Sequence, residues 1–148
     1  MAKFKKTNAM RILDQHHIPY QPHQRDELDS NHPPIYKTLV TQGKSGDHFV
    51  FVVDIDHVLD LKLAAQAVNE KHVHMIKEKD LLPLTGYVHG GCSPLGMKKS
   101  FLTVIDASAQ VFETILVSGG QVGLSVEVNP QELADTVGAS FIPVQTLV

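Results

Sequence analysis

The sequence has one cysteine, Cys92, in 148 residues, so the chain cannot form an internal disulfide. It also has no apolar run near the roughly 20 residues that a membrane-spanning helix needs. Its first ten residues, MAKFKKTNAM, are positively charged, but they lack the apolar stretch of a secretory signal. We therefore expect a cytoplasmic protein with a reduced cysteine and no membrane partner.

An excess of positive charge is missing as well. The formal net charge is −3, so no overall field attracts the protein to a nucleic acid, and a polyanion could bind only at a local patch. Apolar residues make up 43% and charged residues 20%, which is typical of a globular rather than a disordered chain. The length predicts a single domain spanning residues 1–148.

The common signature motifs of metal and nucleotide sites are also absent. There is no Walker loop, no GxGxxG, no HExxH and no GxSxG. His72 and His74 fall on one face of a predicted strand, but no third ligand follows at a recognisable spacing. We therefore predict no metal and no cofactor.

Periodicity and turn residues predict an α+β fold. The first helix is capped by Thr7 and ends before Pro19, and a loop is expected over 21–34. Helices are also expected after Asp56 and from Asn129 to Gly138, with a turn or short helix at 78–82. Strands are expected at 35–40, 48–55, 72–76, 101–105, 114–118 and 124–128. Many strands with short flanking helices favour a mixed, barrel-like β-sheet.

Two glycine-containing turns are candidate binding elements. In TGYVHGGCSPLGMKKS (85–100), Gly90 and Gly91 can take positive φ and leave their N–H groups open to a ligand. Two successive amides can form a nest that binds an anion or a carbonyl. The same reasoning applies to Ser118, Gly119 and Gly120 in VSGGQVG (117–123). Each turn alone is more often only a turn.

Cys92 lies within the first glycine turn. A nucleophilic cysteine needs a base or a positive environment, and His89 is three residues away in a loop that does not determine their separation. The favoured interpretation is a small residue that fits a tight loop. A cysteine hydrolase that uses Cys92 and His89 is the alternative.

Lys37 interrupts an apolar strand pattern. In IYKTLV, alternation places Thr38 on one face and Lys37 with Leu39 on the other. The lysine is either a guard on an edge strand or an ammonium at the floor of a pocket that binds a carbonyl, carboxylate or phosphate. Because both faces carry apolar residues, the pattern leaves both readings open.

Taken in order, the segments TNAMRIL, IYKTLV, VLDLKLAAQAV, TGYVHGGCSPLGMKK, TVIDASA, VSGGQVGLSVEV and QELADTVGA resemble the YbaK/EbsC family. These are free-standing aminoacyl-tRNA deacylases related to the editing domain of bacterial prolyl-tRNA synthetase. The resemblance covers nearly the whole chain. It implies the YbaK/prolyl-tRNA synthetase-associated fold, a mixed barrel-like sheet with flanking helices.

The resemblance also implies a function and a site. The expected activity is removal in trans of a mischarged amino acid, cysteine foremost, from tRNA(Pro), with prolyl-tRNA synthetase as a possible partner. A non-catalytic module that binds the aminoacyl-tRNA or nucleotide end is the alternative. Lys37 is implied to be catalytic, and the substrate-binding residues are implied to be Thr38, Gly90, Gly91, Ser93, Ser118, Gly119 and Gly120.

Two departures from the family pattern concern the substrate. The stretch between Tyr20 and Ile35 is shorter than usual and lacks an alanine-rich helical segment. Gln121 and Val122 stand where the family often has arginine or lysine after the VSGG turn. By the resemblance, the first departure alters a segment that helps to wall the amino-acid pocket, and the second removes positive charge that could contact tRNA.

Overall fold

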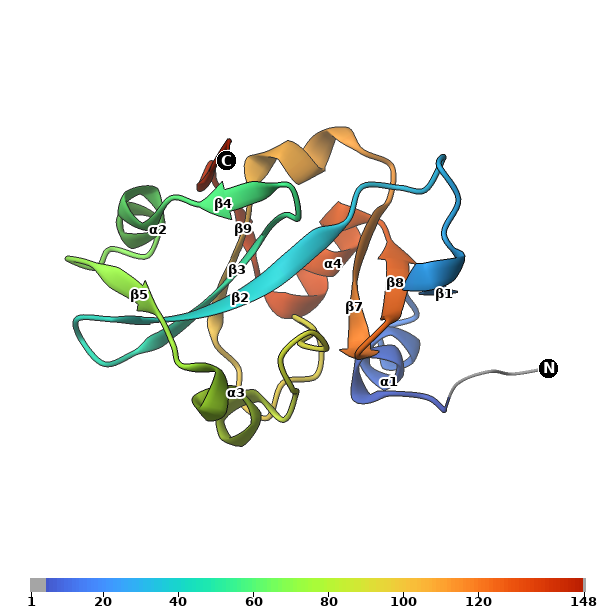
Figure 1. Cartoon of the computed structure of the whole chain (residues 1–148), viewed down its shortest axis with the longest axis horizontal. Helices are drawn as coiled ribbons and strands as arrows, with labels where there is room; N and C mark the ends of the chain where they lie inside the picture. Colours follow the sequence, from blue (N-terminus) through green and yellow to red (C-terminus); the bar gives the residue numbers. More distant parts are fainter. Residues whose placement is uncertain (1–4, 148) are drawn as a thin grey trace.

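A computed structural model of the chain describes residues 5–147 (Figure 1). Within this range the structure has four α-helices and two short 3-10 helices. No helix in this part of the chain is long and apolar enough to cross a bilayer. The helices are α1 (Asn8–Gln15), η1 (Arg25–Glu27), α2 (Leu61–Ala67), α3 (Glu78–Thr85), η2 (Ala107–Val111) and α4 (Pro130–Val137).

The strands form three sheets, with strand orders β1-β8-β7, β5-β2-β3-β6-β9 and β10-β4. No sheet formed by residues 5–147 closes on itself, so the predicted α+β class is confirmed but its barrel-like closure is not seen. The strands are β1 (Gln21–Gln24), β2 (Tyr36–Gly43), β3 (His48–Asp54), β4 (His57–Leu59), β5 (Val73–Met75), β6 (Leu102–Ile105), β7 (Ile115–Gln121), β8 (Leu124–Val128), β9 (Ser140–Phe141) and β10 (Gln145–Leu147).

An antiparallel hairpin of β2 and β3 forms the centre of the largest sheet (Figure 1). On β3, Phe49, Phe51 and Val53 pack with α2 on one face, whereas Val50 and Val52 pack on the other. Both faces are covered, which is why this strand reads as a continuous apolar run. The two strands predicted for this hairpin are confirmed, and β2 continues to Gly43.

The three-stranded sheet β1-β8-β7, here called the smaller sheet, joins the five-stranded sheet at the start of β2. Ile35 forms a parallel bridge with Leu116, and the Leu116 N–H donates to the Pro34 carbonyl at 2.8 Å. Because β7 therefore runs parallel to β2, Lys37 and Ser118, each two residues further along, lie at the same level. This junction positions the candidate site.

The predicted caps of the first and last helices are confirmed. The Thr7 hydroxyl accepts the Met10 N–H at 3.2 Å, and the Asn129 side chain accepts the Glu132 N–H at 3.0 Å. Pro130 occupies the first turn of α4 and needs no donor there.

Two predictions are wrong in detail. The helix expected after Asp56 begins only at Leu61, because residues 57–59 pair with the C-terminal β10 and Asp60 provides the cap. The loop expected over 21–34 contains β1, which pairs with β8, and η1. Both strands depend on partners about 90 or more residues away, which local patterns do not reveal.

Candidate active site

A cavity of about 370 Å³ lies between β2, the start of α3 and the two glycine turns. Four of the predicted site residues line it: Lys37, Thr38, Gly90 and Ser118. They come from three segments that are distant in sequence, so the fold brings them together. The other four predicted residues, Gly91, Ser93, Gly119 and Gly120, do not line this cavity.

Lys37 is half-buried, and its Nζ donates to the His57 carbonyl oxygen at 2.6 Å. At Lys37, β2 pairs with β3 alone, because β5 pairs only with residues 41–43, and Lys37 lines the cavity beside this locally unpaired edge. One ammonium proton is used by His57, which leaves two donors for a ligand. The hydrogen bond also restricts the side chain, so that the charge is held at the cavity wall.

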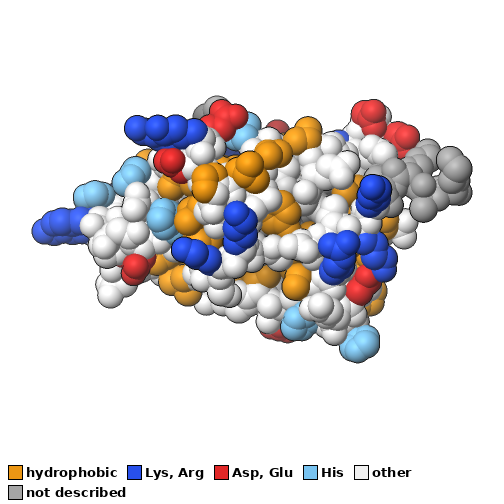
Figure 2. All heavy atoms as spheres, turned by 90° about the horizontal axis from the view of Figure 1, so that it is seen from below, with side chains coloured by type: hydrophobic (Ala, Val, Ile, Leu, Met, Phe, Trp, Pro, Cys, Tyr) orange, Lys and Arg blue, Asp and Glu red, His pale blue; other side chains and the backbone are white. Residues whose placement is uncertain are grey.

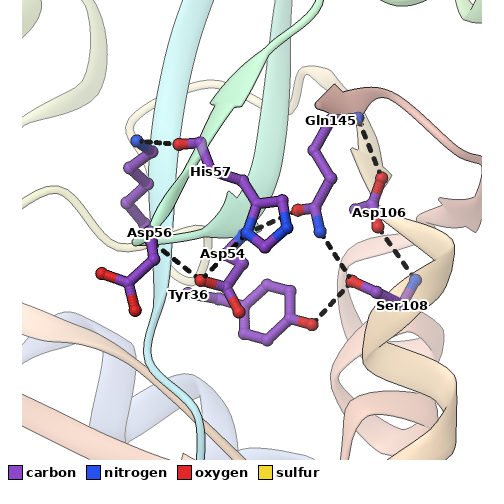
Figure 3. A network of polar contacts seen from close by, with 8 residues as sticks. Tyr36, Asp54, Asp56, His57, Asp106, Ser108 and Gln145 are labelled. Carbon is purple, nitrogen blue, oxygen red and sulfur yellow. Dashed lines mark hydrogen bonds and ion pairs between the residues drawn. The ribbon is translucent and has the colours of Figure 1, made fainter. Parts of the chain in front are cut away.

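The segment that accepts from Lys37 is itself held by a polar network (Figure 3). The ring Nδ1 of His57 lies 3.4 Å from Asp54 Oδ1, a contact that is an ion pair only when the ring is protonated, whereas the Asp56 N–H donates to Asp54 Oδ1 at 2.8 Å. The Asp54 N–H donates to Gln145 Oε1 at 2.9 Å. The Gln145 amide donates to Ser108 Oγ at 3.2 Å, and Ser108 lies 2.7 Å from the Tyr36 hydroxyl. The network therefore links the C-terminal strand to the turn beside Lys37.

Thr38 has a buried hydroxyl with an unmet requirement. No group within residues 5–147 forms a hydrogen bond with its Oγ1. A buried hydroxyl without a partner costs about 1–3 kcal/mol, and most such groups in proteins have one. Since Thr38 lines the cavity, a ligand bound there could satisfy this group.

The two amides of the Gly90–Gly91 pair have different environments. Gly90 is exposed at the cavity and has φ +84°, a conformation that favours glycine. Gly91 is buried, and its N–H donates to the Val88 carbonyl at 3.0 Å. A Cβ atom on Gly91 would lie 2.9 Å from the Val122 nitrogen, so the absent side chain lets the two glycine turns pack together.

The VSGG turn is held by a hydrogen bond within the turn and by another from the start of α1. Ser118 is half-buried at the cavity, and its Oγ accepts the Gly120 N–H at 3.2 Å. The Gly119 carbonyl accepts the Thr7 hydroxyl at 2.5 Å, which ties the turn to the start of α1. Ser118 can therefore still donate its own hydroxyl proton to a ligand.

Ser93 and Cys92 are both buried. Ser93 Oγ accepts the Leu95 N–H at 3.2 Å and thereby shapes the loop. Cys92 lines the cavity, but burial raises the pKa of its thiol to about 11. The thiol is therefore protonated at neutral pH, which argues against a cysteine nucleophile activated by His89, an exposed residue.

Comparison with known proteins identifies the family. The model for the aminoacyl-tRNA editing domain matches residues 26–136. The chain belongs to the aminoacyl-tRNA editing domain family. It is 38% identical over 162 aligned residues, covering 99% of both chains, to EbsC of Enterococcus faecalis, a candidate Cys-tRNA(Pro)/Cys-tRNA(Cys) deacylase.

Solved structures show the same fold. A candidate trans-editing enzyme for prolyl-tRNA synthetase matches with a TM-score of 0.81 at 20% identity, covering 94% of this chain and 95% of that one. A protein described only as hypothetical matches with a TM-score of 0.84 at 18% identity, covering 95% and 100%. At these identities the likeness concerns the fold of the editing domain alone.

Sequence reasoning missed several residues that line the cavity of this editing domain. Met75, Ile76 and Leu81 form an apolar wall from β5 to α3, and Arg25 lies on the side of the smaller sheet. Arg25 comes from the segment that was expected to be only a loop. No local signal marks these residues, because their place depends on how the two sheets meet.

Within residues 5–147, no three His, Cys, Asp or Glu side chains are grouped so that they could hold a metal ion. Besides Arg25, Lys77, Glu78 and His89, the polar groups that line the cavity include an ammonium, hydroxyls and a backbone amide. Such groups can stabilise negative charge that develops on a carbonyl oxygen, and can orient a hydroxyl or a phosphate.

Proposed function

We propose that this protein is an aminoacyl-tRNA deacylase that acts in trans and removes cysteine from mischarged tRNA(Pro). The observation that carries the proposal is the single cavity that contains the anchored Lys37 ammonium, the unpartnered Thr38 hydroxyl, Gly90 and Ser118. Membership of the editing-domain family and the whole-length similarity to EbsC support the same reaction.

The aminoacyl ester is already activated, so its cleavage needs positioning and charge stabilisation more than a strong protein nucleophile. Lys37 Nζ donates to the aminoacyl carbonyl oxygen, on which negative charge grows as the ester is attacked. The Gly90 backbone approaches the same group, and Ser118 donates to the terminal ribose. Thr38 Oγ1 binds the α-amino group, which gives the buried hydroxyl its missing partner.

Two attacking groups fit this arrangement. Water can add to the carbonyl carbon, after which the ester C–O bond breaks and the ribose oxygen takes a proton, releasing the free amino acid. Alternatively, the substrate's own thiol can attack, which releases a cyclic thiolactone and the same ribose hydroxyl. The second route is available only to cysteine and needs no nucleophile from the protein, in agreement with a protonated Cys92.

The proposal extends to the cellular setting. A protein with net charge −3 has little general attraction for tRNA, so delivery by prolyl-tRNA synthetase would raise the local substrate concentration. The substrate is made where translation takes place, and the cytoplasm is therefore the proposed compartment. Co-purification of the two proteins from cells would test this partnership.

The first experiment is deacylation of tRNA(Pro) charged separately with cysteine, alanine or serine. We expect the wild type to cleave the cysteinyl ester, and Lys37→Ala to lose at least about 100-fold in kcat/KM, the usual cost of removing a group that stabilises an oxyanion. Lys62→Ala, which changes an exposed lysine on α2, serves as the control.

Three results would decide the matter. Full activity of a folded Lys37→Ala protein would refute the role of Lys37. Stoichiometric binding of the charged tRNA without turnover by the wild type would favour a non-catalytic binding module. Detection of the thiolactone by mass spectrometry would select thiol attack over hydrolysis.

A further inference from the structure

The cavity that contains Lys37 continues into an open groove. The two hollows share Arg25, Ile35 and Gly90, and the groove extends along residues 26–32 and past Val122. When the ester of the substrate lies at Lys37, the rest of the tRNA must extend out of the cavity across its rim. The residues shared by both hollows mark this boundary on the side of the smaller sheet.

Arg25 is the cation at this boundary. It is exposed, and no carboxylate within residues 5–147 forms an ion pair with it. Its backbone is fixed, because the Arg25 N–H donates to the Gly123 carbonyl at 2.8 Å. The guanidinium is therefore carried on a fixed backbone beside the VSGG turn, with its donors available.

The turn itself offers no positive charge, since Gln121 and Val122 occupy its exposed tip. Figure 2 shows one face of the molecule on which lysine and arginine side chains lie at several places, two of them adjacent, rather than in one patch. With a net charge of −3 as well, individual cations decide where a phosphate can bind. Arginine suits this role because its fork of donors matches phosphate oxygens.

We propose that Arg25 binds the phosphodiester on the 5′ side of the terminal adenosine of the aminoacyl-tRNA. This inference rests on the deacylase function proposed above. With the ester at Lys37 and Gly90 and the terminal ribose at Ser118, the phosphate attached to that ribose reaches the cavity boundary. Asp26 and Asp29 line the groove beyond it, so this region repels further phosphates and accommodates the neutral nucleoside better.

The other candidate for the same phosphate is Lys77, which lines the cavity at the start of α3. Its neighbour Glu78 also lines the cavity and lowers the local attraction for an anion. Arg25 has the acidic groove residues near it as well, but it also adjoins the VSGG turn, where the terminal ribose is placed. The two cations therefore make distinguishable predictions.

The test uses an acceptor minihelix that carries cysteine through an amide, which is not cleaved as the ester is. One version has the normal terminal phosphodiester and the other a neutral methylphosphonate at that position. Fluorescence anisotropy should show that the wild type binds the version with the normal phosphodiester about tenfold more tightly than the methylphosphonate version, as expected for a charge-assisted contact. Arg25→Ala should reduce this preference below about twofold, and Arg25→Lys should retain part of it.

Arg11→Ala is the matched control, because it removes the chain's only other arginine, an exposed residue on α1. It should keep the tenfold preference, as should Lys77→Ala. Loss of one phosphate contact should also reduce the slope of log affinity against log salt by about 0.7. With the ester substrate, Arg25→Ala should raise KM about tenfold and leave kcat within about twofold.

Retention of the phosphate preference by Arg25→Ala, or its loss in Lys77→Ala, would overturn the assignment of Arg25. Absence of any preference in the wild type would do the same. If the wild type shows the preference through Arg25 but cleaves no ester, the phosphate site stands and the deacylase proposal fails. The two proposals are thus separated.

Discussion

Two residues that line the same cavity differ in how deeply they are buried. Lys37 remains half-buried and keeps a fixed acceptor for its ammonium, whereas Cys92 is 7% exposed. Burial raises the pKa of the Cys92 thiol from 9.0 to about 11, although a hydrogen bond with Thr85 acts in the opposite direction. Cys92 therefore acts as a small neutral side chain in the cavity wall.

We predict that Cys92→Ala lowers kcat/KM less than about threefold, whereas loss of a true nucleophile costs on the order of 10⁴-fold or more. Alkylation of the folded wild type by iodoacetamide should be slow at pH 8 and accelerate as the pH approaches 11. The same reaction in urea provides the control. Rapid alkylation at pH 7 together with inactivation would instead support the alternative hypothesis of a cysteine hydrolase.

The same pKa shift predicts a pH dependence of stability. Above pH 9 the unfolded chain loses the thiol proton, while the folded chain keeps it until about pH 11. The free energy of unfolding should therefore fall as the pH rises from 9 to 11. In Cys92→Ala the fall should be less steep, as measured by urea denaturation across this range.

At the scale of elements, the site depends on contact between two turns. The Gly91 position faces the backbone of Gln121 and Val122, and a Cβ atom on Gly120 would lie 3.0 Å from the Tyr87 ring. The Tyr87 hydroxyl in turn donates to the Leu95 carbonyl at 2.5 Å. The glycines that do not line the cavity thus determine how the residues that do line it are placed.

Gly91→Ala should separate these turns. The added Cβ would meet backbone atoms that cannot rotate away, so we expect a loss of about 1–3 kcal/mol in the free energy of unfolding and a marked fall in kcat/KM. Gly46→Ala is the control, since it has open space around it and φ +95°. It should cost about 1–2 kcal/mol through backbone strain and leave kcat/KM unchanged, in parallel denaturation and deacylation assays.

At the scale of the whole molecule, one buried carboxylate joins the C-terminal segment to the body. Asp106 is 4% exposed and accepts N–H groups from Ser108 at 2.9 Å, Val144 at 2.8 Å and Gln145 at 3.0 Å. The Gln145 side chain in turn accepts the Asp54 N–H, next to the turn whose His57 carbonyl accepts from Lys37 (Figure 3). The end of the described chain is thereby connected to the cavity.

Asp106→Asn replaces an accepting oxygen by a donor that faces backbone N–H groups. We expect the free energy of unfolding to fall by about 2–4 kcal/mol, because charged acceptors are lost and buried donors remain. Asp60→Asn is the matched control: Asp60 accepts two N–H groups at the start of α2, and asparagine caps as well as aspartate. An equal loss in both variants on urea denaturation would contradict the special role of Asp106.

Local features of the chain determined much of this fold. The caps Thr7 and Asn129 and the apolar runs of β2 and β3 could be predicted, because a cap and a side-chain alternation involve neighbouring residues. The motifs around Lys37, Gly90 and Ser118 likewise indicated the family. The resemblance to the family implied that these three residues belong to one site, whereas no local sequence pattern predicts that they line the same cavity.

The tertiary structure alone decided the rest. Strands β1, β4 and β10 are three or four residues long and exist only through distant partners. The way the sheets meet placed Arg25 at the cavity boundary, and contact with the backbone of Gln121 and Val122 made Gly91 a packing residue. Exposure, hydrogen-bond partners and pKa are properties of a residue's surroundings, and those surroundings come from segments that lie far apart in the chain.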